Sequence, residues 1–155
     1  PHLVGYGEAS DAHHMSTPHP EGAGAERALD DALARAGLTA DSIDYINLHG
    51  TASTKNDEVE AALVARRFPA HVHASSTKGF MGHTLGAAGI VEAVISLLAV
   101  ETGWMPGTLN TQHLDTDCGP QIRMAPARGD VRYAMSNSFG FGGNNCALIF
   151  GRGAA

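Results

Sequence analysis

Three polar segments contain residue types that could bind a ligand or take part in catalysis. They are His-Gly-Thr-Ala-Ser at 49–53, a loop at 76–83 that holds one lysine and one histidine, and a glycine-rich turn at 139–145. Each lies at the end of a predicted strand, which is where ligands usually bind in α/β sheets. A single histidine or lysine in a loop is more often structural or solvated. A functional interpretation therefore depends on the three segments acting together.

The hydrophobic pattern predicts strands that alternate with helices. Short segments typical of strands occupy 3–6, 43–48, 71–75, 131–136 and 146–150. The first is followed by a predicted loop to about residue 24, and apolar residues at helical spacing predict helices over 25–36 and 57–68. The segment 86–100 is apolar almost all round and predicts a buried central helix, whereas the glycines and prolines of 102–120 predict a loop. This alternation is typical of an α/β sheet.

Size, charge and cysteine content exclude several classes of function. A chain of 155 residues allows one hydrophobic core, so we expect one domain over 1–155. The net charge of −6 has the wrong sign for a nucleic-acid partner. The apolar segment 86–100 is interrupted by Glu92 and is too short to cross a bilayer of about 30 Å, so no membrane is expected. No secretory signal is visible and two cysteines make a poor disulfide framework, which favours the cytoplasm.

Four motifs follow one another along nearly the whole chain. They are Gly-Tyr-Gly at 5–7 with Ser-Asp-Ala-His-His-Met at 10–15, the 49–53 segment followed by Asp57 and Glu60, Lys-Gly-Phe-Met-Gly-His at 78–83 followed by Leu-Gly-Ala-Ala-Gly at 85–89 and Glu92, and Asn-Ser-Phe-Gly-Phe-Gly-Gly at 137–143. In this order they resemble the C-terminal half of the β-ketoacyl synthases, the condensing enzymes of fatty-acid and polyketide assembly in the thiolase-like superfamily. The resemblance implies a thiolase-like C-terminal half, in which a mixed β-sheet is packed with a buried central helix and flanking helices.

The resemblance also implies a catalytic role for three residues. When a malonyl thioester loses its carboxylate, the resulting enolate carries its charge on the thioester oxygen, and His49 and His83 would donate hydrogen bonds to that oxygen. Losing one such donor typically costs roughly 3 to 4 kcal/mol of transition-state stabilisation. Lys78 would hold a positive charge near the histidines and order the polar network together with Glu92.

Five further residues are implied in substrate binding. The hydroxyls of Thr51 and Ser53 would bond the pantetheine arm that delivers the substrate, and ordinary loop capping is the alternative. Phe139 and Phe141 would gate the acyl pocket, while backbone N–H groups of the same turn, around Gly140, would complete an oxyanion hole. As isolated aromatic residues, both would more often belong to a core.

Asp57 and Glu60 lie three residues apart on a predicted helix and face the same way. The resemblance implies that they support the lysine loop, directly or through a bound cation, and a solvated acidic face is the alternative. No metal-ligand set and no cofactor is assigned, because the phosphopantetheine arm belongs to the carrier protein.

The family's nucleophilic cysteine, which carries the acyl chain, belongs to its N-terminal half. Cys118 lies in a predicted loop and Cys146 in an apolar strand, so neither stands where the family places that residue. We therefore expect this chain to be the C-terminal catalytic portion of a 3-oxoacyl-acyl-carrier-protein synthase. Alone, the chain should lack condensing activity. Its partners would be the cysteine-bearing half and an acidic acyl carrier protein, within a homodimer or heterodimer. Arg66 and Arg67 are conceivable contacts for the carrier, or simply a solvated pair.

Some positions depart from the family pattern. Ser53 stands where threonine is usual, Thr-Lys-Asn at 54–56 replaces Pro-x-Gly, and Asn144 replaces a frequent threonine. None removes a catalytic group, and together they are compatible with a subfamily serving a polyene or another secondary pathway.

Three other classes of protein fit the sequence less well. His71 and His73 share a strand face, as in some zinc sites, but no third ligand accompanies them. A non-catalytic partner of the chain-length-factor type would also lack the cysteine, but it would have no need to keep His49, Lys78 and His83. No complete nucleotide-binding glycine motif follows a strand.

Overall fold

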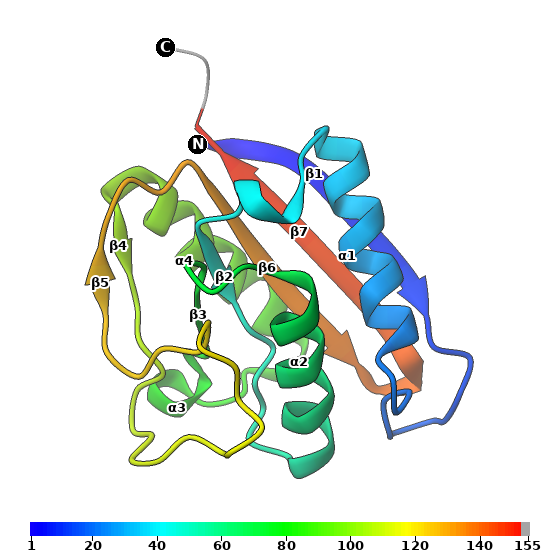
Figure 1. The fold of residues 1–155 in the computed structure, drawn as a ribbon. Helices are drawn as coiled ribbons and strands as arrows, with labels where there is room; N and C mark the ends of the chain where they lie inside the picture. The colour runs from blue at the N-terminus through cyan, green and yellow to red at the C-terminus, as the bar shows by residue number, and fades with distance from the viewer. Residues whose placement is uncertain (153–155) are drawn as a thin grey trace.

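The computed structural model, described here for residues 1–152, contains a five-stranded sheet in the order β1-β7-β6-β2-β3 (Figure 1). The strands and helices, in chain order, are β1 (His2–Ser10), α1 (Ala23–Ala36), β2 (Tyr45–Asn47), α2 (Thr54–Arg67), β3 (His73–Ser75), α3 (Lys78–Met81), α4 (Ala88–Thr102), β4 (Trp104–Met105), β5 (Ala127–Arg128), β6 (Tyr133–Gly140) and β7 (Asn144–Gly151). Strands β4 and β5 form a separate antiparallel ribbon.

The sheet is mixed, as predicted. Strand β2 runs parallel to both β3 and β6, whereas β7 is antiparallel to β6 and to β1. The short strands β2 and β3 lie next to each other, so the loops that leave their carboxyl ends begin close together. Those loops contain the 49–53 segment and the 76–83 segment.

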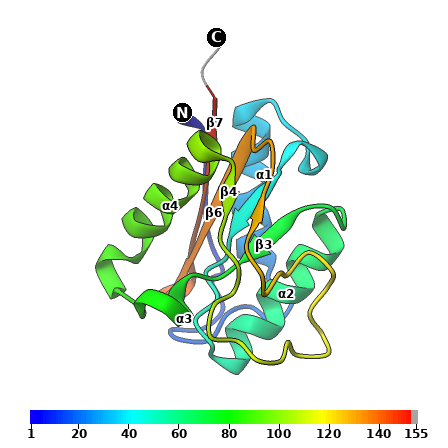
Figure 2. The ribbon, with the colours of Figure 1, turned by 90° about the vertical axis from the view of Figure 1, so that its left-hand side faces the viewer.

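Helices cover both faces of the sheet. Helices α1 and α2 lie on one face and α4 lies on the other (Figure 2). The larger core cluster fills the α1 and α2 side, with Leu29, Ile46, Leu63 and Ile149 fully buried. A smaller cluster around Tyr45 and Val100 fills the α4 side. Because side chains alternate along β2 and β6, Asn47 and Ser136 share the α4 face with Tyr45 and Ala134.

The predicted central helix, apolar almost all round, is buried on only one side in this chain. Glu92, Ala93, Ser96 and other residues of α4 are buried, but its outer side exposes Ile90, Val94 and Leu98, spaced four residues apart. With the preceding 3-10 turn, Leu85–Thr102 is an 18-residue segment of mean hydropathy 1.7, of which 33% is buried. This segment is long and apolar enough to span a membrane. The prediction that it is too short to cross a bilayer is therefore wrong. A core helix passes the same test, and Glu92 is directed into the fold.

Most predicted boundaries shift by a few residues, and β6 runs over Tyr133–Gly140 rather than 131–136. Strand β1 continues to Ser10, because its pairing with β7 extends through a segment whose glycines and polar residues resemble a loop. Strand β2 is only Tyr45–Asn47, shorter than the apolar segment 43–48. Helix α2 starts at Thr54 rather than at residue 57, since Ser53 has the extended backbone of an N-cap. The predicted loop 102–120 also contains β4.

Candidate active site

His49 and His83 lie against each other at the carboxyl end of β2. Their ring centroids are 5.7 Å apart and the ring planes are perpendicular. His49 is buried, at 7% exposure, whereas His83 is exposed in the loop after α3. The two segments singled out from the sequence therefore bring their histidines together.

The electrostatic surroundings keep His49 neutral. Burial, with smaller coulombic contributions from Lys78 and His83, lowers the pKa of His49 to about 3. The Nδ1 atom of His49 is buried and has no hydrogen-bond partner among the described residues. A neutral imidazole retains one N–H group, so His49 can donate a hydrogen bond without carrying charge.

The hydrogen bonding of His83 fixes which of its nitrogens can donate. The backbone N–H of Leu85 donates to His83 Nδ1 at 3.2 Å. Because Nδ1 accepts in this arrangement, the proton of a neutral His83 lies on Nε2. The side chain therefore has an N–H group available for a ligand.

Lys78 and Glu92 form a buried ion pair between α3 and α4. Lys78 Nζ donates a hydrogen bond to Glu92 Oε1, and both side chains are almost wholly inaccessible to solvent. Burial raises the pKa of Glu92, while the hydrogen bond from Lys78 opposes this shift. Glu92 is therefore the buried counter-ion of Lys78.

Glu60 fixes the loop that carries His49. The backbone N–H of His49 donates to Glu60 Oε1 at 2.9 Å, and that of Gly50 donates to Glu60 Oε2 at 2.8 Å. Asn137 Nδ2 also donates to Oε1, at 3.3 Å. Burial raises the pKa of Glu60, and these three hydrogen bonds oppose the shift. Glu60 is therefore bonded to the histidine loop, and both Asp57 and Glu60 line a cavity beside Gly50.

A buried hydrogen-bond network that was not predicted joins β2 to β3. Tyr45 Oη is 3.2 Å from Ser75 Oγ and accepts a hydrogen bond from Asn47 Nδ2 at 3.1 Å. Ser75 Oγ donates to the carbonyl of Pro106 at 2.6 Å, and His73 Nε2 lies 2.8 Å from the same carbonyl. The sequence did contain a signal for this network, because Asn47 and Ser75 are polar residues within predicted strands.

Three oxygens on the α4 side of the sheet have no hydrogen-bond partner within the described residues. They are Asn47 Oδ1, Glu92 Oε2 and Ser136 Oγ. Buried polar atoms are nearly always satisfied, and amide, carboxylate and hydroxyl oxygens suit a hard cation or an ordered water. The described residues contain no group of three or more His, Cys, Asp or Glu side chains placed to hold a metal ion. Any cation here would therefore depend on one carboxylate oxygen, from Glu92, and on the neutral oxygens of Asn47 and Ser136.

The implied substrate-binding residues lie at different distances from the histidines. The hydroxyls of Thr51 and Ser53 are 3.0 Å apart beside His49 in the chain. The Phe139 ring centroid is 6.0 Å from that of His49. Phe141 is 82% exposed and Gly140 is exposed next to it. The structure thus places one of the two phenylalanines against the histidine pair and the other on the surface.

The glycine-rich turn is tied to the loop that follows β1. The backbone N–H of Asp11 donates to the Gly143 carbonyl at 2.8 Å, and Asn145 Nδ2 donates to Asp11 Oδ1 at 2.9 Å. The backbone N–H of Gly142 also donates to the Met15 carbonyl at 2.7 Å. These bonds make the turn and the loop one hydrogen-bonded unit.

Neither cysteine belongs to the histidine cluster. Cys118 lies in the segment between β4 and β5, Cys146 lies in β7, and both are free thiols. Burial raises the pKa of each thiol, which disfavours the nucleophilic thiolate.

Arg66 and Arg67 are held in ion pairs rather than free. Arg66 Nη2 lies 2.9 Å from Glu26 Oε2, and Arg67 pairs with Glu26 and Asp30. These contacts link α2 to α1 and account for both arginines without a partner protein.

Comparisons with known proteins agree on one family. A profile for "Beta-ketoacyl synthase, C-terminal domain" matches residues 2–112. The mitochondrial 3-oxoacyl-[acyl-carrier-protein] synthase of Arabidopsis thaliana is 44% identical over 96% of this chain and 34% of its own length.

Two solved structures share the fold. A ketosynthase, ApeO, solved in complex with its chain length factor, ApeC, from Xenorhabdus doucetiae, superposes with a TM-score of 0.92 and 42% identity over 97% of this chain and 39% of that one. A type II PKS acyl-carrier protein in complex with its ketosynthase gives a TM-score of 0.90 and 26% identity over 98% of this chain and 38% of that one. The chain spans little more than a third of each of these proteins.

Proposed function

Because this chain belongs to the β-ketoacyl synthase C-terminal domain family, we propose that it supplies the His49, His83 and Lys78 machinery of a 3-oxoacyl-acyl-carrier-protein synthase. The reaction is the condensation of malonyl-acyl-carrier protein with an acyl group held on an enzyme cysteine. The observation that carries the proposal is the perpendicular pair of histidines, 5.7 Å apart, with His49 buried and neutral.

The histidines act on the enolate. The malonyl thioester loses carbon dioxide, and the electron pair of the broken carbon–carbon bond moves to the enolate, whose negative charge rests on the thioester oxygen. N–H groups of His49 and His83 donate hydrogen bonds to that oxygen and lower the barrier. A neutral His49 suits this role, since it donates without giving up its proton. The enolate carbon then attacks the acyl thioester carbonyl, and the cysteine thiolate leaves.

Lys78 acts through its charge. It lies beside His49, is held by Glu92, and contributes to keeping the His49 imidazole neutral. We assign it to ordering the polar network rather than to nucleophilic attack.

A second segment must complete the site. Both cysteines of this chain lie outside the histidine cluster, so the nucleophile belongs to another part of the enzyme. The exposed apolar side of α4, formed by Ile90, Val94 and Leu98, is a surface that this part would cover. His83 and Phe141 are exposed on this chain and would border the shared acyl site. We therefore propose that this chain alone does not catalyse the condensation reaction.

The substrate carrier is an acyl carrier protein. Support comes from the similar ketosynthase solved with its acyl-carrier protein. Thr51 and Ser53, whose hydroxyls lie together next to His49, would bond the pantetheine arm. Since Arg66 and Arg67 are already paired with α1, other positive groups of the complete enzyme would contact the carrier.

A chain-length-factor-like partner subunit is the second candidate, because the similar ketosynthase ApeO was solved together with such a factor. A factor of this type does not need the histidine pair. Only the condensing enzyme would lose activity when that pair is removed.

The test uses the complete enzyme with a cysteine-bearing N-terminal half. We expect His49→Ala and His83→Ala each to lower decarboxylation of malonyl-acyl-carrier protein by about a hundredfold or more. Glu101→Gln, on the exposed end of α4, serves as the control and keeps full activity. Unchanged decarboxylation and condensation in both histidine variants would support the partner subunit instead.

A further inference from the structure

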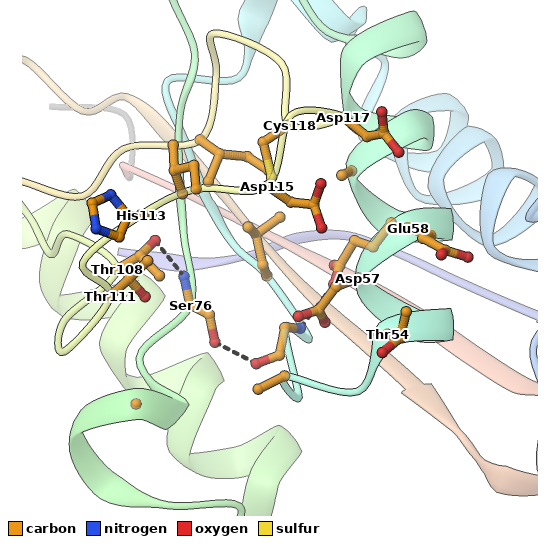
Figure 3. A pocket seen from close by; sticks show the side chains of 18 of the residues that line it. Thr54, Asp57, Glu58, Ser76, Thr108, Thr111, His113, Asp115, Asp117 and Cys118 are labelled. Atoms are coloured by element: carbon orange, nitrogen blue, oxygen red, sulfur yellow. Dashed lines mark hydrogen bonds between the residues drawn. The ribbon is translucent and has the colours of Figure 1, made fainter.

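A cavity of about 470 Å³ lies between the first turns of α2 and the segment 108–122 (Figure 3). This volume is within the range of sites that hold small organic ligands. The close-up shows the side chains of Asp57, Asp115 and Cys118 directed toward the same space (Figure 3).

The cavity is separate from the histidine pair. Gly50, Ala52 and Thr54 line it, whereas the alternate residues Thr51 and Ser53 do not. Neither His49 nor His83 lines it either. The 49–53 segment, in which Gly50 and Ala52 have positive φ, therefore places alternate residues against this cavity. Part of the wall comes from 113–122, beyond the residues that the family profile matches.

The inner wall is apolar. Leu48, Ala61, Leu109, Leu114 and Ile122 all line the cavity. Such a surface favours a hydrocarbon body over a strongly hydrated ion.

The mouth is acidic. Asp57, Glu58, Asp115 and Asp117 line the cavity, and the described residues around it include neither lysine nor arginine. Glu58 is paired with Lys55, which is itself largely exposed. Asp57, Asp115 and Asp117 form no ion pair within the described part of the chain. Together with burial, the negative charges of these three aspartates raise the pKa of Cys118, so their field reaches the interior.

We propose that this cavity binds a small organic amine, with the ammonium group at the acidic mouth lined by Asp57, Asp115 and Asp117 and the hydrocarbon body against the apolar wall. A bare metal ion is a poor fit, because no group of three or more such ligands converges within the described residues. An anionic or neutral ligand of the same shape would lack the attraction of the carboxylates.

Binding here would reach both catalytic loops. Ser76, which lines the cavity, donates through Oγ to the Gly50 carbonyl at 2.7 Å and accepts from the backbone N–H of Lys78 at 3.3 Å. The backbone N–H of Ser76 also donates to Thr108 Oγ1 at 3.3 Å. An amine in the cavity would therefore contact the residues that connect the His49 loop to the Lys78 loop. The binding itself does not depend on the proposed synthase activity.

The test uses cyclohexylmethylammonium as the probe, with cyclohexylmethanol and cyclohexanecarboxylate as matched neutral and anionic compounds. The complete protein is titrated calorimetrically, and alkylation of each cysteine by iodoacetamide is followed by peptide mass spectrometry. We expect only the ammonium compound to bind at this site and to slow alkylation of Cys118 at least fivefold. Cys146, which lies outside the cavity, reacts at an unchanged rate and is the internal control.

A charge variant tests the role of the carboxylates. Asp115 and Asp117 are exposed, so the double variant Asp115→Asn, Asp117→Asn should fold normally. The double variant should weaken the protection that the ammonium compound gives Cys118 against alkylation at least tenfold. Asp41 is exposed and lies outside the cavity, so Asp41→Asn should leave this protection unchanged. Equal protection by the alcohol, equal protection of both cysteines, or an unaltered double variant would each overturn the proposal.

Discussion

The carboxylate of Glu60 accepts a hydrogen bond from the backbone N–H of His49 at 2.9 Å, across eleven residues of chain. The same carboxylate accepts from the N–H of Gly50, so one buried side chain of α2 satisfies two consecutive donors. The position of the His49 imidazole therefore depends on a residue that need not touch the substrate.

Replacing Glu60 by glutamine should loosen this loop. The amide keeps one acceptor oxygen but turns an NH₂ group toward a backbone donor, leaving a buried N–H without a partner. We expect a loss of about 1 to 3 kcal/mol in the free energy of unfolding, measured by urea denaturation, together with lower activity. The matched change Glu58→Gln, at an exposed ion pair on the same helix, should cost less than about 1 kcal/mol. Equal effects of the two changes would show that Glu60 has no special role.

The neutral state of His49 predicts how stability depends on pH. The folded-state pKa of about 3 lies below the ordinary value of 6.5, so between these values the unfolded chain binds more protons. Stability from this group is complete above about pH 6.5 and is lost as the pH falls toward 3.

The measurement compares urea unfolding of the parent protein and His49→Gln at several pH values. Between pH 3 and 6.5, one proton changes the slope of unfolding free energy against pH by up to about 1.4 kcal/mol per pH unit. The variant should therefore have the shallower slope. Other titrating groups contribute to both proteins and cancel in the difference. Parallel curves would contradict a buried neutral imidazole.

Because Lys78 and Glu92 form a buried ion pair, we expect a single variant to be less stable than the double variant. Lys78→Met leaves a carboxylate buried without its counter-ion, which should cost about 3 to 5 kcal/mol or shift Glu92 to its protonated form. The double variant Lys78→Met, Glu92→Leu removes both charges and should regain much of the stability while remaining inactive. Thermal unfolding and condensation assays separate these outcomes. A double variant less stable than Lys78→Met would rule out charge burial as the cause.

Features set by neighbouring residues in the chain could be predicted from the sequence, whereas features set by contacts between distant residues could not. Most of the order of strands and helices follows from local periodicity, although α3, β4 and β5 were not predicted, and His49 and His83 stand out because each lies in a loop motif of the family. The network around Tyr45 was missed because its partner Ser75 lies 30 residues away and polar strand residues give no periodic signal. The role of Glu60 at His49 was also missed, since the spacing of Asp57 and Glu60 places both on one helix without revealing what each contacts.

Tyr45 predicts a separable positioning effect. Tyr45→Phe keeps the buried ring but removes the hydroxyl that joins Asn47 to Ser75. We expect a cost of about 1 to 2 kcal/mol in unfolding free energy, and a fall in the condensation rate with little change in apparent substrate affinity. Steady-state kinetics of the complete enzyme distinguish the two parameters. A change in affinity alone would mean that this network does not support the catalytic loops that follow β2 and β3.

The exposed side of α4 makes a prediction about assembly. Leu98 is 50% exposed and Val94 is 46% exposed, and both lie on the apolar side that the proposed partner segment would cover. Because neither is fully buried here, Val94→Asp and Leu98→Asp should change the fold of this domain little. Burying a carboxylate at an apolar interface is costly, so either change should abolish stable association with the cysteine-bearing half. Ala62→Asp, on the exposed face of α2, is the control.

Co-purification of the two halves and flotation with lipid vesicles provide the measurement. Loss of co-purification in the α4 variants, with Ala62→Asp unaffected, is the expected result. If the parent chain instead floats with vesicles and the α4 variants do not, the apolar Leu85–Thr102 segment binds lipid and the interface proposal is wrong. Since Glu92 of this segment is buried against Lys78 on the inner side, only the outer residues should influence either readout.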